Sequence, residues 1–313
     1  MQMVLSVEEE SGKNAYVLSA LAKLPDNPFV AFSALHFLQR DPLTIRVALQ
    51  QLVQSINPNT ERGVQDLAWL TEHHLVDLLS NILSDYGTTN ENIACNVCAI
   101  VFDVSAQPKG RFELLKFGVV PKIIESARKF PKQQKLVYFV CGALGNLLWE
   151  TKSRDTVLLK EIVSFLMESV IHNETEEKIV REGIRGLYNA CYVDEIAEML
   201  SNSDSWLEKV EEIINGFNNS TAHLFFQKLQ QKLENAQENN LVKKISWVSE
   251  SSEGVTDSIV QEQGREERCS VKESDSMNDC TYESNCSIFP TCAILSIVTG
   301  SLLLSIFAYY RWR

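Results

Sequence analysis

Three stretches of similar character recur at equal spacing along this chain, and each ends at a polar residue. Asp103 follows ACNVCAIVF, Asn146 follows VYFVCGALG and Asn189 follows VREGIRGLY, so successive polar residues lie 43 positions apart. Small and apolar residues dominate each stretch, as expected for a helix that is mostly buried. A unit of this length cannot bury its apolar face alone. The spacing therefore predicts units that stack on one another into a solenoid.

Helical patterns fill the chain from about Ser11 to Lys244, without the alternation that is typical of strands. Asp41 and Pro42 supply a helix N-cap and a first-turn proline ahead of LTIRVALQQLVQSI, and Asn57-Pro58 is expected to end that helix. Further polar segments between the apolar stretches are short, as connections between antiparallel helices usually are. The sequence therefore predicts an all-α fold.

Two segments resemble the armadillo repeat. LLKFGVVPKIIESA (Leu114 to Ala127) is similar to the junction between the first two helices of that repeat, with Gly118 at the bend and Pro121 opening the next helix. FVCGALGNLLWE (Phe139 to Glu150) is similar to its third helix. The resemblance covers roughly residues 92–194 and implies a right-handed α-solenoid. The next unit has Glu161 and Ser164 at the bend positions and is also compatible with HEAT-like repeats.

The armadillo resemblance implies a concave groove that binds an extended peptide or a partner helix. Importin-type receptors place a tryptophan four positions before the groove asparagine, but this chain has Ala99, Gly142 and Arg185 there. Two alternatives to binding in the groove stay open. The asparagines could bond the backbone of a neighbouring repeat, and Trp149 could belong to the core. The candidate groove residues are Asp103, Asn146, Trp149, Arg185 and Asn189.

No arrangement of residues in the sequence indicates catalysis. Cys95 and Cys98 have the spacing of a redox motif, but they lie within a segment with a helical pattern. Packing in the core is therefore the better interpretation. His73 and His74 are adjacent and would point about 100° apart on a helix, so they cannot chelate one ion together. We therefore expect no enzyme, no cofactor, no metal site and no small-molecule substrate.

The net charge limits which classes of partner are expected, and the cysteine content indicates the cellular compartment. The formal net charge is −12, with 41 acidic and 29 basic residues, which offers no overall attraction to a phosphate backbone. Nucleic acid is therefore excluded as an expected partner. The eight cysteines are sparse, and half of them lie in helical segments, which indicates reduced thiols in a cytosolic compartment.

The C-terminal region contains a long segment without Asp, Glu, Lys, Arg or His. Residues 288–310, IFPTCAILSIVTGSLLLSIFAYY, would form a helix of about 34 Å, enough to cross a hydrocarbon core of about 30 Å. We expect a tail anchor over 287–310, followed by a basic tail over 311–313. The residues that define this anchor are Ile288, Leu295, Leu302, Leu303, Leu304, Arg311 and Arg313.

Composition divides the rest of the chain into three regions. Residues 1–65 are expected to form a helical cap, and residues 66–245 the armadillo-like repeats with a C-terminal capping helix. Residues 246–286 read as an acidic disordered linker, since 249–283 carry ten acidic and three basic residues. The N-terminus, with Glu8, Glu9 and Glu10, lacks the pattern of an export signal, so the repeats are expected to face the cytosol.

These expectations combine into a non-enzymatic, tail-anchored adaptor that recruits a cytosolic protein to an organelle surface. The serine- and threonine-diluted span and the basic tail favour the mitochondrial outer membrane, with the endoplasmic reticulum second. The alternative is a membrane-tethered armadillo co-chaperone that promotes nucleotide exchange on a DnaK-type heat-shock chaperone. Faster ADP release from such a chaperone would distinguish this alternative.

Overall fold

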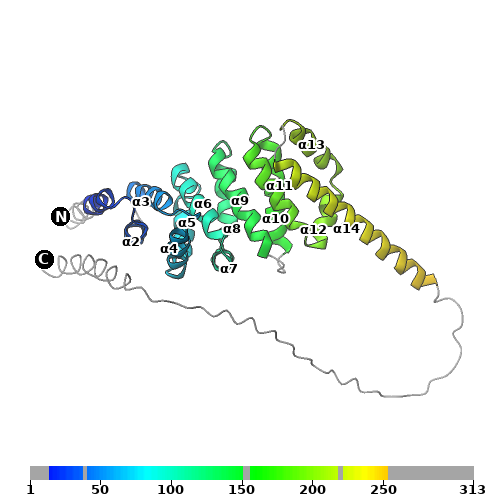
Figure 1. Cartoon of the computed structure of the whole chain (residues 1–313), viewed down its shortest axis with the longest axis horizontal. Helices are drawn as coiled ribbons and strands as arrows, with labels where there is room; N and C mark the ends of the chain where they lie inside the picture. Colours follow the sequence, from blue (N-terminus) through cyan, green and yellow to red (C-terminus); the bar gives the residue numbers. More distant parts are fainter. Residues whose placement is uncertain (1–13, 38–40, 151–155, 218–220, 253–313) are drawn as a thin grey trace, which may run out of the picture. The chain divides into compact units, whose positions relative to one another are not determined.

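The computed structural model describes residues 14–37, 41–150, 156–217 and 221–252, with side chains for all but 149–150 and 239–252. Every described residue lies in a helix or in a connection between helices, so the predicted all-α class is confirmed for this part of the chain (Figure 1). Residues 14–23 are helical. The later helices are α2 (Pro28–Phe37), α3 (Pro42–Ser55), α4 (Glu61–Glu72), α5 (Leu75–Tyr86), α6 (Glu91–Ser105), α7 (Pro108–Lys116), α8 (Val119–Lys129), α9 (Gln134–Glu150), α10 (Thr156–His172), α11 (Glu177–Ala190), α12 (Asp194–Ser201), α13 (Asp204–Asn215) and α14 (Thr221–Ser252).

Side-chain caps fix where several helices begin. The Asp41 carboxylate accepts a hydrogen bond from the Thr44 backbone N–H at 3.0 Å, and Pro42 occupies the first turn of α3, both as predicted. At the start of α6, the Asn90 side chain accepts from the Ile93 N–H at 3.2 Å. These caps satisfy backbone donors that a helix start leaves unpaired.

Five helices pack against one another in chain order, and we call them the third helices: α3, α6, α9, α11 and α14. The last four begin at Glu91, Gln134, Glu177 and Thr221, so their starts are 43, 43 and 44 positions apart. The shorter helices between them pack along their flanks: α5 on α6, α8 on α9 and α10 on α11. Figure 1 shows the helices of residues 14–252 following one another in chain order.

A left-handed residue makes the bend between the two shorter helices of a group. Gly118 has φ 60° and ψ 37° between α7 and α8, as the sequence predicted. His74 has φ 70° and ψ 22° at the equivalent place between α4 and α5. In the following group, Glu161 and Ser164 lie inside the uninterrupted α10, which agrees with the loss of the bend residues there.

Two expected region boundaries fall inside helices. Position 65 lies within α4, which begins after the Thr60 cap and packs with α5 and α7, so the second group of helices starts at Glu61. Position 245 lies within α14, which continues to Ser252 and therefore includes the first residues of the expected linker. The remainder of the linker, the anchor over 287–310 and the tail over 311–313 lie outside the described residues. None of the described helices combines the length and the apolar character needed to span a bilayer.

Candidate partner-binding face

The third helices carry the candidate groove residues that the structure describes. Asp103 lies on α6, Asn146 on α9, and Arg185 and Asn189 on α11. The side chain of Trp149 lies outside the described residues. We call the surface formed by the accessible side chains of α6, α9, α11 and α14 the third-helix face.

Asn146 connects three third helices through its side-chain amide. Its Nδ2 donates to Ser105 Oγ of α6 at 3.0 Å, and its Oδ1 accepts from Arg185 Nη1 of α11 at 3.0 Å. Arg185 also donates from Nη2 to the Gly142 carbonyl at 3.2 Å. The structure therefore brings two predicted groove residues together, and both are bonded to neighbouring helices within the protein.

A buried carboxylate lies between two arginines on α11. Glu182 accepts from Arg185 Nε at 2.8 Å and from Arg181 Nη2 at 3.0 Å, while its side chain is 9% exposed. Two cations on one carboxylate leave this cluster with a net positive charge, and the Arg181 side chain keeps 30% exposure. Sequence reasoning did not identify this cluster, because an arginine pair spaced by four also fits an ordinary solvated helix face.

Asn189 is bonded inside the protein. Its Nδ2 donates to the Gly145 carbonyl of α9 at 2.8 Å, and the residue is 7% exposed. We call Asp103, Asn146 and Asn189, which are spaced by 43 positions, the ladder. The Asn189 geometry corresponds to the alternative in which a ladder asparagine bonds the backbone of the neighbouring unit. Its main contribution is to hold α9 and α11 together.

Asp103 differs from the two asparagines of the ladder. It is half-buried in the last turn of α6, and among the described residues no donor bonds its carboxylate. Burial raises the pKa of Asp103 to about 6. A carboxylate near a helix C-terminus is also opposed by the helix dipole. Its position therefore does not serve helix stability.

An aromatic cluster lies between α6 and α9. The ring centroid of Phe102 is 5.8 Å from that of Tyr138 and 6.1 Å from that of Phe139, and all three side chains remain partly accessible. Such rings supply rigid contact area at interfaces. This cluster was not predicted from the sequence, because the ladder contains only one position in each helix.

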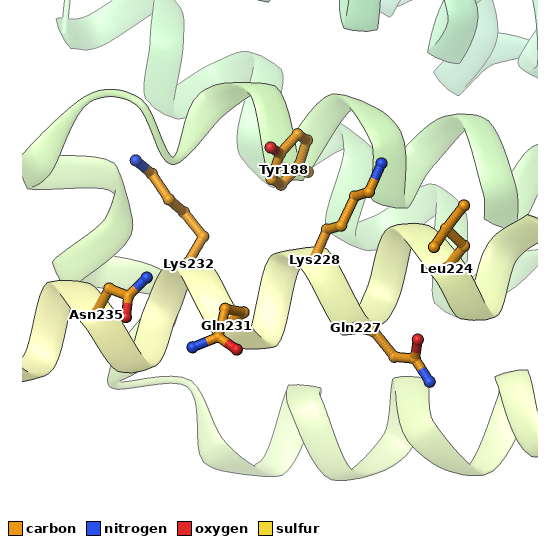
Figure 2. A pocket seen from close by; sticks show the side chains of 7 residues that line it. All are labelled: Tyr188, Leu224, Gln227, Lys228, Gln231, Lys232 and Asn235. Carbon is orange, nitrogen blue, oxygen red and sulfur yellow. The ribbon is translucent and has the colours of Figure 1, made fainter.

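A second set of residues that was not predicted from the sequence lies between α11 and α14. Tyr188 and Tyr192 have hydroxyl oxygens 3.1 Å apart, and Lys232 Nζ lies 4.4 Å from the centroid of the Tyr192 ring. Lys228 and Lys232 flank Tyr188 (Figure 2). The signal was present in the sequence, because Lys232 lies 43 positions after Asn189 and extends the ladder by one unit.

The described cysteines are packed in the core and do not form a reactive pair. Cys95, Cys98, Cys141 and Cys191 are free thiols, and Cys98, Cys141 and Cys191 are buried. Burial raises the pKa of Cys141 and of Cys191 to about 12 and that of Cys98 still further, so all three stay protonated near neutral pH. Within the described ranges, no group of three or more His, Cys, Asp and Glu side chains is placed to hold a metal ion.

Comparison with models of protein families, with curated proteins and with solved structures finds no match for this chain. The class of the described part thus rests on its own geometry: an all-α protein built of consecutive helix groups whose third helices pack in series.

Proposed function

We propose that this chain is a non-enzymatic adaptor that binds a partner protein on its third-helix face and is anchored in a membrane by its C-terminal segment. The observation that carries the proposal is the composition of this face. It combines aromatic rings between α6 and α9, an arginine cluster on α11 and lysines on α14. Aromatic and arginine side chains are enriched at protein interfaces.

We further propose that the helices are arranged as a right-handed α-solenoid of armadillo/HEAT-like repeats. Its support is the regular start of the third helices, the left-handed bend at Gly118 and the uninterrupted α10 in the following group. In a solenoid of this kind the third-helix face is concave, and an extended peptide crosses successive third helices. Asn146 and Asn189 then hold these helices in register, and the partner contacts the aromatic and cationic side chains beside them.

The proposed anchor is the apolar segment over 287–310, with the helical region on the cytosolic side. Its support is the sequence, in which residues 288–310 include no Asp, Glu, Lys, Arg or His and are followed by Arg311 and Arg313. The mitochondrial outer membrane is favoured, with the endoplasmic reticulum second. The adaptor would thereby concentrate a cytosolic protein on that surface.

A recruitment experiment tests this function. Proximity labelling from the N-terminus of the full chain should identify a cytosolic protein that is enriched in the membrane fraction. Deletion of 288–313 should return both the chain and this protein to the cytosol as a complex. The substitution Tyr138→Glu, which places a charge in the aromatic cluster, should abolish binding. Loss of the complex upon the deletion alone would contradict the proposal.

A matched control separates loss of the face from loss of the fold. Val157 lies on α10 and is 77% exposed, so Val157→Glu adds the same charge away from the third helices. Circular dichroism should show unchanged helix content for both variants. If Tyr138→Glu keeps the partner while Val157→Glu loses it, the partner binds elsewhere.

A further inference from the structure

The seam between α11 and α14 contains an open hollow of about 370 Å³. One lining residue, Tyr188, comes from α11, and the others come from α14 (Figure 2). The residues that line it are Tyr188, Leu224, Gln227, Lys228, Gln231, Lys232 and Asn235. Its volume lies within the range of about 300–1,000 Å³ that is common for binding sites.

The lining is cationic in a chain of formal net charge −12. It contains two lysines and no carboxylate. Within the described ranges, no acidic group lies at ion-pair distance from either ammonium; Lys228 Nζ lies 5.8 Å from the Phe225 ring centroid, and Lys232 Nζ packs over Tyr192. Lys209, in contrast, pairs with Glu212 at 2.9 Å. Rings engage an ammonium without accepting all of its hydrogen bonds, so Lys228 and Lys232 keep donors for a ligand.

The spacing of the lining residues defines the form of a fitting ligand. Lys228 and Lys232 are four positions apart on α14, which separates them by one helical turn or about 6 Å. Gln227 and Gln231 form a second row with the same spacing beside the lysines. Alternate residues of an extended chain lie about 6.6–6.8 Å apart on one side. Two carboxylates at i and i+2 therefore match the lysines, while the glutamines face the ligand backbone, which has unpaired donors and acceptors.

We infer that this hollow binds an extended segment of the partner protein in which two acidic residues are separated by one residue. The inference rests on the proposed function and deepens it, because it gives the partner a chemical signature at one end of the third-helix face. The first acidic side chain pairs with Lys228 and the second with Lys232. Tyr188 lies between the two lysines and packs against the backbone of the intervening residue, whose side chain points away from the hollow.

Peptide binding by the full chain, held in detergent micelles, tests this inference. The probe is a fluorescent twelve-residue peptide of Gly and Ala with two glutamates at i and i+2, followed by fluorescence anisotropy. A peptide with glutamines in place of the glutamates should bind about tenfold more weakly, toward the upper end of what the loss of two partly exposed ion pairs produces. Raising the salt concentration should weaken the glutamate peptide specifically.

Variants of the chain locate the binding. Lys228→Gln with Lys232→Gln should weaken the glutamate peptide about tenfold, whereas Lys228→Arg with Lys232→Arg should retain it. The matched control is Lys129→Gln with Lys132→Gln, which removes the same charge from exposed positions at the end of α8 and in the following connection. This control should bind like the unaltered chain.

Several results would overturn the inference. These are no binding of the glutamate peptide, equal binding of the glutamine peptide, full binding by the lysine-to-glutamine variant, or tighter binding of a peptide with its glutamates at i and i+4, the helical spacing. Failure of the proposed function is separate, because it is detected by Tyr138→Glu on α9 in the recruitment experiment. If binding of the partner depends on Tyr138 but not on Lys228 and Lys232, the adaptor function is supported and the inference of an acidic ligand segment is refuted.

Discussion

The Asn189 side chain is a structural contact between α9 and α11, since its amide reaches the Gly145 carbonyl at 2.8 Å in a buried position. Replacement by alanine leaves that carbonyl without its donor, and we expect a loss of about 1 kcal/mol of unfolding free energy. Asn189→Asp should cost more, because it places a carboxylate against a carbonyl oxygen. Urea denaturation followed by circular dichroism measures both, and equal stability of all three proteins would contradict the contact.

Asp103 gives the chain a pH-dependent stability of defined sign. Its pKa is about 6 in the folded chain, raised by burial from 3.8, so the folded state holds the proton more tightly than the unfolded state. The ionised Asp103 carboxylate therefore lowers the unfolding free energy by its full amount above pH 6. This loss declines as the pH falls from 6 to about 4 and is absent below that. Allowing for solvent screening of this half-buried group, Asp103→Asn should add about 1 kcal/mol at pH 7.

The difference between the unfolding free energies of Asp103→Asn and of the unaltered chain is the quantity to follow across pH. We expect it to decrease toward zero between pH 6 and pH 4. A constant difference across this range would show that the Asp103 pKa is not raised. Asn146→Asp is not a suitable control, because that change also disrupts the bonds to Ser105 and Arg185.

At the scale of elements, the bend between the short helices should respond in opposite directions at its two sites. His74 and Gly118 both adopt positive φ, which costs a residue with a side chain about 1–2 kcal/mol. His74→Gly should therefore stabilise the chain by about 1 kcal/mol, and Gly118→Ala should destabilise it by about the same amount. Thermal unfolding measures both, and a loss of stability in His74→Gly would contradict this account of the bend.

Local signals made some elements predictable from sequence. The cap at Asp41 and the bend at Gly118 each depend on a few adjacent residues. The role of Arg185 could not be predicted in the same way, because its guanidinium bonds Asn146 of another helix. The boundary at 65 missed the Thr60 cap, although that signal was local and readable.

Of the candidate site, the sequence predicted chiefly the ladder, which has one position in each of three helices. The ladder lies on α6, α9 and α11, and its two asparagines bond within the protein, whereas accessible side chains lie beside them. Whether a polar side chain faces a neighbouring helix or solvent depends on how two helices pack, and one helical position changes the direction by about 100°. Tyr188, one position before Asn189, illustrates this difference.

At the scale of the whole molecule, the proposed anchor predicts where the chain resides. Deletion of 288–313 should release it into the soluble fraction, because the remaining sequence has no comparably long apolar segment. Replacing Arg311 and Arg313 with serine should redistribute the full chain toward the endoplasmic reticulum. Fractionation and fluorescence imaging check these outcomes. Unchanged mitochondrial staining of the serine variant would show that the basic tail does not determine the destination.

Site-specific photo-crosslinking tests the central claim, that the third-helix face binds the partner. A photoreactive phenylalanine analogue is placed at Tyr138, Tyr188 or Gln231 on this face and, in separate chains, at Phe112 or Val157, which are 65% and 77% exposed on α7 and α10. We predict that the first three positions crosslink to one common protein and that the last two do not. Crosslinks to that protein from Phe112 and Val157 alone would contradict the account.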